Sequence, residues 1–155
     1  MSELPPWDDL KSGAGCPLCA PRPKRNEFIY FVASLEVSSL YLSRNQASHG
    51  ACLLVFDPRH AVRLDQLSKN EWSEYANDLQ RAETAIMRVS DADHINVELL
   101  GNAVPHLHWH IIPRYKDEER WGGPIWTTNL SELPQRRLDD EEYSELAERL
   151  NNALA

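Results

Sequence analysis

The strongest constraint on the fold is a run from Pro105 to Pro113 in which histidines alternate with apolar residues. Side chains on a strand point to opposite faces in turn, so this alternation predicts a β-strand. The three histidines, His106, His108 and His110, would then share one face of the strand. The apolar residues between them would share the other face, which we expect to lie against the core.

Three of the six histidines on one strand face are hard to explain by packing. Each buried imidazole costs desolvation, and close imidazoles resist protonation together. The cluster is explained if it faces a metal or an anion, and two kinds of chemistry are consistent with such a face. All three imidazoles could bind one catalytic metal with an open position. Alternatively, one imidazole attacks phosphorus while the others hold phosphate oxygens. Spacing alone leaves both open.

Basic residues lie near the ends of the predicted strands and could border the same cleft. A locally basic mouth on an acidic protein favours a phosphate-bearing substrate. We therefore expect such a mouth to be formed by Arg44, Arg59, Arg114 and Lys116.

The rest of the pattern predicts an α+β fold with a largely antiparallel sheet. Aromatic and β-branched runs indicate strands near 28–32, 39–42, 51–56 and 95–100. A long helix should follow the Ser68–Glu71 capping box, and a last helix should begin near Asp140. The last helix would bury Tyr143, Leu146, Leu150 and Leu154. The apolar stripe of the long helix consists of Trp72, Tyr75, Ala76, Leu79, Ala82, Ala85, Ile86 and Val89.

Composition and charge narrow the function. The 155 residues suit one domain, and the net charge of −8 argues against a general nucleic-acid binder. The longest apolar runs have six residues, whereas a membrane span needs about 20. The N-terminus lacks the basic start and apolar core of a secretory signal, so we expect a cytoplasmic protein without membrane contact.

Residues 1–25 contain half of the ten prolines and are predicted to form an irregular lead segment. This segment carries Cys16 and Cys19 in a CxxC. Three cysteines are too few for a disulfide framework, so the pair indicates metal or redox chemistry in a reducing compartment. No strand is predicted before the pair, which argues against a redox site.

The run His106-Leu-His-Trp-His-Ile-Ile resembles the histidine-triad (HIT) signature, in which histidines alternate with apolar residues. Residues 96–105 resemble the strand and phosphate-facing loop before that signature, and 50–67 resemble the preceding strand and turn. The resemblance covers roughly residues 14–127 and is closest to bacterial members of the family. It implies a HIT-like fold with about five antiparallel strands, one long helix and a C-terminal helix. The implied parts are the lead segment, a HIT domain at 26–127 and a C-terminal extension at 128–155.

The resemblance also implies a nucleotidyl hydrolase or transferase acting at the α-phosphate of a nucleotide conjugate. His108 would be the nucleophile that forms a covalent nucleotidyl-histidine, and His110 would contact the phosphate or the leaving-group oxygen. A hydrogen bond from the other nitrogen of His108 to a carbonyl would fix the reactive tautomer. Because a histidine keeps the third triad position, hydrolysis is favoured over transfer to a sugar phosphate. The expected substrates are dinucleoside polyphosphates or nucleoside phosphoramidates.

Further site residues follow from the same resemblance. The turn at 101–104 would stabilise charge on the phosphate, and Asn45 is the candidate contact to the ribose. The family also implies a homodimer. The expected nucleotide- and phosphate-binding residues are Asn45, Gly101, Asn102, Val104 and Arg114.

Several relatives hold zinc with a CxxC and two histidines. Here the resemblance implies the ligands Cys16, Cys19, His60 and His106, a closed set of the kind found in structural zinc sites. This assignment weakens a three-histidine metal site. Many members carry a further histidine where Ala51 or Cys52 stands here, which motivates a second reading as a nucleotide-binding sensor with little turnover.

The segment after the triad contains two tryptophans separated by Gly-Gly-Pro-Ile. Trp121 and Trp126 could form a lid over a base or leaving group, or pack against the sheet or a second copy. We favour packing.

Overall fold

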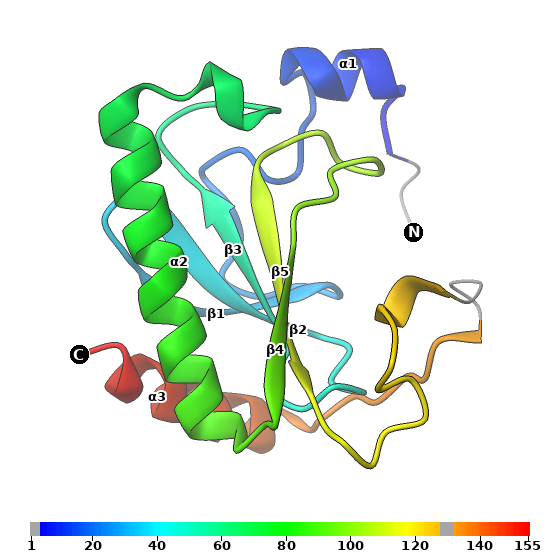
Figure 1. Ribbon diagram of the computed structural model, residues 1–155. Helices are drawn as coiled ribbons and strands as arrows, with labels where there is room; N and C mark the ends of the chain where they lie inside the picture. Colours follow the sequence, from blue (N-terminus) through cyan, green and yellow to red (C-terminus); the bar gives the residue numbers. More distant parts are fainter. Residues whose placement is uncertain (1–3, 128–131) are drawn as a thin grey trace.

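The computed structural model describes residues 4–127 and 132–155, and its centre is one antiparallel sheet (Figure 1). The strand order is β1-β2-β3-β5-β4, with every neighbouring pair antiparallel. This confirms the predicted α+β fold with five strands. The bounds are β1 (Ile29–Ser34), β2 (Ser38–Ser43), β3 (Cys52–Phe56), β4 (His94–Glu98) and β5 (His108–Arg114).

The two longer helices begin where the sequence predicts. In α2 (Lys69–Ser90), Ser68 Oγ accepts a hydrogen bond from the Glu71 amide, and the reciprocal bond completes the capping box. The helix α3 (Asp140–Ala153) begins in the same way after Asp139. Two short 3₁₀ turns, η1 (Leu64–Gln66) and η2 (Ile125–Thr127), lie in the connections.

A short helix, α1 (Trp7–Ser12), occupies the lead segment, which was predicted to be irregular. The prediction was wrong for these six residues, which are too few to show a helical period. Only Leu10 of this helix is buried. Gly13 ends it in the left-handed conformation, with φ of +94°.

Helices α2 and α3 cover one face of the sheet and form a single core with it. Leu40, Leu54 and Ile111 from three strands are fully buried in this core. Tyr143 of α3 is also fully buried and stacks on Tyr30 of β1, with ring centroids 5.6 Å apart. The C-terminal helix therefore shares the core of the HIT-like region.

The predicted stripe of α2 holds except at its first member. Tyr75, Ala82 and Ile86 are fully buried, but Trp72, in the first turn of the helix, is 43% exposed. Asp78, a fully buried carboxylate on the same helix, was not predicted from the sequence.

The Asp78 carboxylate ties α2 to the turn between β1 and β2. It accepts hydrogen bonds from the backbone amides of Glu36 and Val37 at 3.2 and 2.9 Å. It also accepts one from Ser38 Oγ at 2.7 Å. A buried charge is tolerated when such donors surround it.

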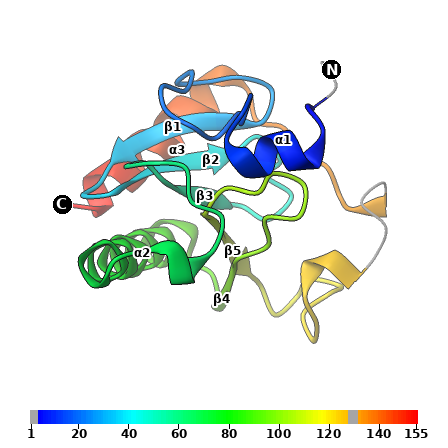
Figure 2. The same cartoon turned by 90° about the horizontal axis from the view of Figure 1, so that it is seen from above.

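The opposite face of the sheet carries the histidines. In the register, His108 pairs with Val55 and His110 pairs with Leu53, whereas Trp109 pairs with Leu54 on the core face. The alternation therefore turns His108 and His110 away from the two helices. Seen from above, α2 lies on one side of the sheet and the lead segment with α1 on the other (Figure 2).

Across the described ranges, 4–127 and 132–155, the structure has no helix with the length and hydropathy needed to cross a membrane.

Candidate active site and metal-binding cluster

The structure divides the three histidines between two places. His106 precedes β5 and is 2% exposed, with its ring against the lead segment. His108 and His110 lie on β5, and their ring centroids are 4.9 Å apart. Leu107, Trp109 and Ile111 all join the core, as predicted, although regular strand pairing starts only at His108.

His106 belongs to a cluster with His60, Cys16 and Cys19. One donor atom from each residue lies within 4.8 Å of the other three. His106 Nδ1 is 3.6 Å from Cys16 Sγ and 3.7 Å from Cys19 Sγ, and His60 Nδ1 is 3.4 Å from Cys19 Sγ. Tetrahedral zinc would set sulfur–nitrogen separations of about 3.6 Å. The four residues fit such an ion and can bind a metal. In the described part of the chain, no other group of His, Cys, Asp or Glu meets the same criterion.

The far nitrogen of each cluster histidine is held by a backbone carbonyl. His106 Nε2 lies 2.7 Å from the Phe56 oxygen, and His60 Nε2 lies 3.1 Å from the Lys11 oxygen. A carbonyl only accepts, so each Nε2 carries the proton and each Nδ1 is left with a free lone pair. Metal-binding histidines are oriented in this way.

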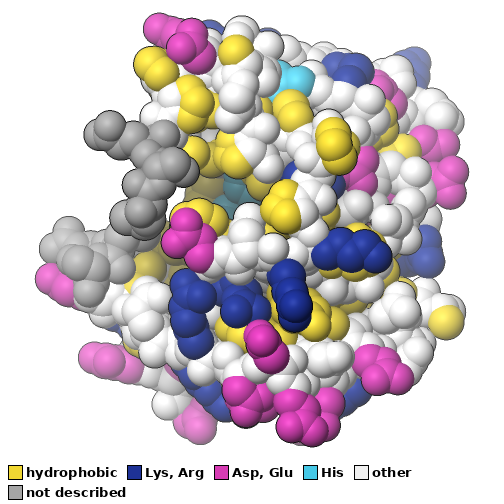
Figure 3. Space-filling view, turned by 180° about the vertical axis from the view of Figure 1, so that it is seen from behind, with side chains coloured by type: hydrophobic (Ala, Val, Ile, Leu, Met, Phe, Trp, Pro, Cys, Tyr) yellow, Lys and Arg dark blue, Asp and Glu magenta, His cyan; other side chains and the backbone are white. Residues whose placement is uncertain are grey.

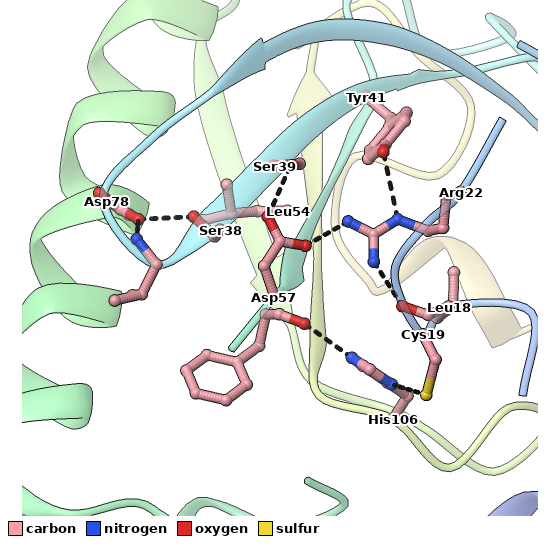
Figure 4. A network of polar contacts seen from close by, with 12 residues as sticks. Leu18, Cys19, Arg22, Ser38, Ser39, Tyr41, Leu54, Asp57, Asp78 and His106 are labelled. Carbon is pink, nitrogen blue, oxygen red and sulfur yellow. Dashed lines mark hydrogen bonds and ion pairs between the residues drawn. The ribbon is translucent and has the colours of Figure 1, made fainter. Parts of the chain in front are cut away.

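An ion pair fastens the lead segment beside the cluster (Figure 4). The Arg22 guanidinium pairs with the Asp57 carboxylate and donates to Tyr41 Oη and to the Leu18 oxygen. Asp57 also accepts from Ser39 Oγ at 2.6 Å. Sequence reasoning missed this network, since both residues look like ordinary surface charges in the sequence.

The backbone fixes the tautomer of His108. Its Nδ1 donates to the His106 carbonyl oxygen at 2.7 Å. The bond expected from the sequence is therefore present, and it leaves the Nε2 lone pair free. Burial lowers the pKa of His108, so the imidazole is neutral at pH 7 and can act as a nucleophile.

His110 is also neutral at pH 7. Burial and the neighbouring His108 lower its pKa to about 4. Its ring meets Trp126 edge-on, with centroids 5.6 Å apart, and Trp126 Nε1 donates to the Glu98 carboxylate on β4.

A cavity of about 380 Å³ opens beside His110. In the space-filling view, histidine is visible at the base of a hollow bordered by hydrophobic side chains (Figure 3). Cys52 lines the cavity and is 2% exposed, and this burial raises the pKa of its thiol. The cavity walls include Phe28, Ser43, Asn45, Ala51, Leu53, Ile112, Glu118, Arg120, Ile125, Trp126, Leu133 and Pro134.

The two tryptophans after the triad have different positions. Trp126 is a wall of the cavity and packs against His110. Trp121 is 38% exposed and borders a shallow hollow along β4. The packing of Trp126 agrees with the prediction that the two tryptophans pack rather than form a lid. In this position the Trp126 ring also borders the cavity.

Asn45 lines the cavity, but backbone groups engage its amide. Its Nδ2 donates to the Pro134 oxygen at 3.1 Å, and its Oδ1 accepts from the Arg136 amide at 3.1 Å. Asn45 thus joins the end of β2 to the segment before α3. A contact with ribose stays a prediction.

The predicted phosphate turn at 101–104 leads directly into His106. Gly101 adopts a positive φ of +75°, and the Val104 oxygen accepts from the His106 amide at 2.9 Å. The Asn102 carbonyl accepts a hydrogen bond from Trp7 Nε1 at 3.0 Å. The side chain of Asn102 is exposed.

Arg114 does not join His108 and His110. It is 2% exposed, and it lies four residues beyond His110 on β5, a distance of about 13 Å. Its guanidinium pairs with Glu118 and donates to Asn96 and to the Gly123 oxygen. These contacts fasten the segment after β5.

The predicted basic mouth is not formed. Arg59 pairs with Glu71, and Lys116 pairs with Asp93. Arg44 lies over the Tyr143 ring, 4.2 Å from its centroid. Like Arg114, these three residues contact other parts of the fold. The carboxylate or aromatic ring that each one contacts could not be identified from the sequence.

The HIT domain family model matches residues 31–117. This is more than half of the chain, so the protein belongs to the HIT domain family.

Solved structures agree with this fold. A histidine triad protein from Bradyrhizobium japonicum superposes with a TM-score of 0.73 at 24% identity, covering 83% of this chain and 92% of that chain. A zinc-bound histidine triad family protein from Mycobacterium smegmatis superposes with a TM-score of 0.54 at 22% identity, covering 94% and 88%.

Among curated proteins, the chain is similar to a bis(5'-adenosyl)-triphosphatase of Saccharomyces cerevisiae. The two are 42% identical over 60 residues, which is 36% of this chain and 29% of the yeast protein. The match therefore spans less than a third of the length of that relative.

Proposed function

We propose that this protein hydrolyses a nucleotide conjugate at its α-phosphate through a covalent nucleotidyl-histidine on His108. The observation that carries this proposal is the 2.7 Å hydrogen bond from His108 Nδ1 to the His106 oxygen. It leaves Nε2 as a neutral, oriented nucleophile.

The reaction would proceed in two displacements. The Nε2 lone pair of His108 attacks the α-phosphorus, and the bond from phosphorus to the leaving group breaks. Water then attacks the same phosphorus and releases the nucleoside monophosphate and His108. Backbone amides of the turn at 101–104 would stabilise the charge that develops on phosphate oxygens. His110 would contact the phosphate or the leaving-group oxygen.

The substrate class we propose is a dinucleoside polyphosphate or a nucleoside phosphoramidate. The similarity to the yeast triphosphatase supports the first. The cavity beside His110 supports either, because about 380 Å³ with mostly apolar walls suits a nucleoside.

We propose that zinc occupies the cluster of Cys16, Cys19, His60 and His106 and acts structurally. Four protein ligands form a closed set with no position for substrate. Bound there, the metal would hold the lead segment against the strand that carries the nucleophile.

The homodimer and the cytoplasmic location also stay proposals. The thiols of Cys16, Cys19 and Cys52 are unpaired, which suits a reducing compartment. Light scattering coupled to gel filtration would give the mass in solution.

A nucleotide sensor with little turnover is the second candidate. The observation in its favour is that Ala51 or Cys52 stands where many members carry a supporting imidazole, and the Cys52 thiol is buried in the hydrophobic core. Tight nucleotide binding without product release would favour this reading.

Steady-state hydrolysis of a dinucleoside triphosphate tests the first proposal. We expect the substitution His108→Ala to lower kcat by a factor on the order of 10⁴ or more, as removal of a nucleophile does in other enzymes. Turnover by this variant close to that of the wild type would overturn the mechanism.

A further inference from the structure

The helix α1 connects the metal-binding cluster to the turn at 101–104. It carries a contact to each of them, and Leu10, 1% exposed, fastens it to the protein. Figure 1 shows α1 above the loop that leads into β5. A helix of six residues has little stability of its own, so these contacts determine where it lies.

On the cluster side, α1 packs against His60. The Lys11 carbonyl accepts from His60 Nε2 at 3.1 Å, while His60 Nδ1 faces Cys19 Sγ at 3.4 Å. Gly13 brings the end of the helix close to the same ring, since a Cβ atom there would lie 3.2 Å from His60 Cγ. The orientation of His60 therefore determines the position of the helix end.

On the loop side, the first residue of α1 holds the turn. Trp7 Nε1 donates to the Asn102 carbonyl at 3.0 Å, a bond between residues 95 positions apart. The Trp7 ring is 46% exposed, so core packing does not account for it. Asn102 lies next to Gly101, whose positive φ gives the turn its shape.

We propose that Trp7 is a positioning residue for the turn at 101–104 and that metal in the cluster fixes this position through His60 and α1. The inference rests on the proposed function, in which the backbone amides of that turn face the phosphate. Donors to a developing charge contribute most when they are already in place. Loss of the Trp7 bond should therefore lower kcat more than it changes KM.

The test uses the full-length, zinc-loaded protein and the substitution Trp7→Phe. Phenylalanine keeps an aromatic ring and removes the Nε1–H donor. The matched control is Trp72→Phe, at a tryptophan of α2 with similar exposure, 43%. Zinc content is measured first in both variants, and we expect it to equal that of the wild type.

Two readouts follow. In amide-resolved NMR spectra, Trp7→Phe should shift the amide signals of residues 101–104, and removing zinc from the wild type should do the same. With a dinucleoside triphosphate, kcat per active site should fall roughly 2- to 10-fold, the effect of one hydrogen bond, with KM unchanged. The Trp72→Phe control should match the wild type in both.

Unchanged amide signals of residues 101–104 in Trp7→Phe, or in the zinc-free wild type, would overturn the proposal. Wild-type kcat in Trp7→Phe would do the same. If the wild type shows neither turnover nor a covalent nucleotidyl-histidine, the proposed function fails, and the amide signals still decide whether the metal and the turn are coupled.

Discussion

At the scale of single residues, the proposed chemistry depends on keeping two imidazoles neutral inside the protein. His108 donates to a carbonyl of its own chain, so its tautomer does not depend on a neighbouring side chain. The His110 ring lies against two aromatic rings, those of His108 and Trp126. Burial disfavours the charged form of both.

His110 should make the protein less stable in mild acid. Its pKa is about 4 when folded and about 6.5 when unfolded. Between these values the unfolded chain binds more protons, so stability rises with pH and is lost as pH falls from 6.5 toward 4. We expect His110→Asn to show a smaller decrease in Tm between pH 7 and pH 5 than the wild type.

The control is His94→Asn, because His94 is exposed at the start of β4. It should keep the wild-type dependence of Tm on pH. Equal pH dependence in His110→Asn and the wild type would show that His110 does not titrate as described.

At the scale of elements, one buried carboxylate holds the long helix to the sheet. Asp78 accepts from two backbone amides of the turn between β1 and β2 and from the hydroxyl of Ser38 at the start of β2. The turn leads into β2, which lies between β1 and β3 in the sheet. Loss of the carboxylate would leave these donors buried without acceptors.

We expect Asp78→Ala to lower the free energy of unfolding by about 3 kcal/mol or more, because each buried unpaired donor costs about 1 to 3 kcal/mol. Denaturation in urea measures it. The neighbouring substitution Asn77→Ala changes an exposed residue of the same helix and should have little effect. A similar small loss in both variants would contradict the assigned role.

At the scale of the whole molecule, the metal-binding cluster joins three distant parts of the chain. Cys16 and Cys19 come from the lead segment, His60 follows β3, and His106 precedes β5. The pair of Arg22 and Asp57 fastens the same segment independently. The cluster residues should therefore stay close together when the metal is removed.

Metal removal should lower stability without unfolding the protein. A ligand present at 100 times its Kd adds about 2.7 kcal/mol, so chelation should lower Tm by roughly 5 to 10 °C in a chain of this length. Metal analysis should find one zinc per chain in the wild type and in Cys52→Ala, and none in Cys16→Ser. An unchanged Tm after verified zinc removal would contradict a structural metal.

Much of the fold followed from the sequence because its signals are local. The strand alternation around His108, the capping box at Ser68 and the face of α3 depend on residues close in sequence. The helix α1 was missed because six residues show no period. Asp78 was missed because nothing local marks a buried carboxylate.

The site was only partly predictable, for a related reason. The structure brings together Cys16, Cys19, His60 and His106, which the family resemblance had grouped. The prediction of a basic mouth was wrong because the tertiary fold determines which groups an arginine contacts. Arg114 pairs with Glu118, in the segment after β5, and no spacing in the sequence predicts this ion pair.

The central claim is that His108 forms a covalent bond to a nucleotide, and intact-protein mass spectrometry tests it most directly. The wild type and His108→Ala would each be mixed briefly with a dinucleoside triphosphate and quenched at alkaline pH. The proposed mechanism predicts a gain of one nucleoside monophosphate on the wild type and none on the variant. Product formation without any adduct on the wild type would contradict it.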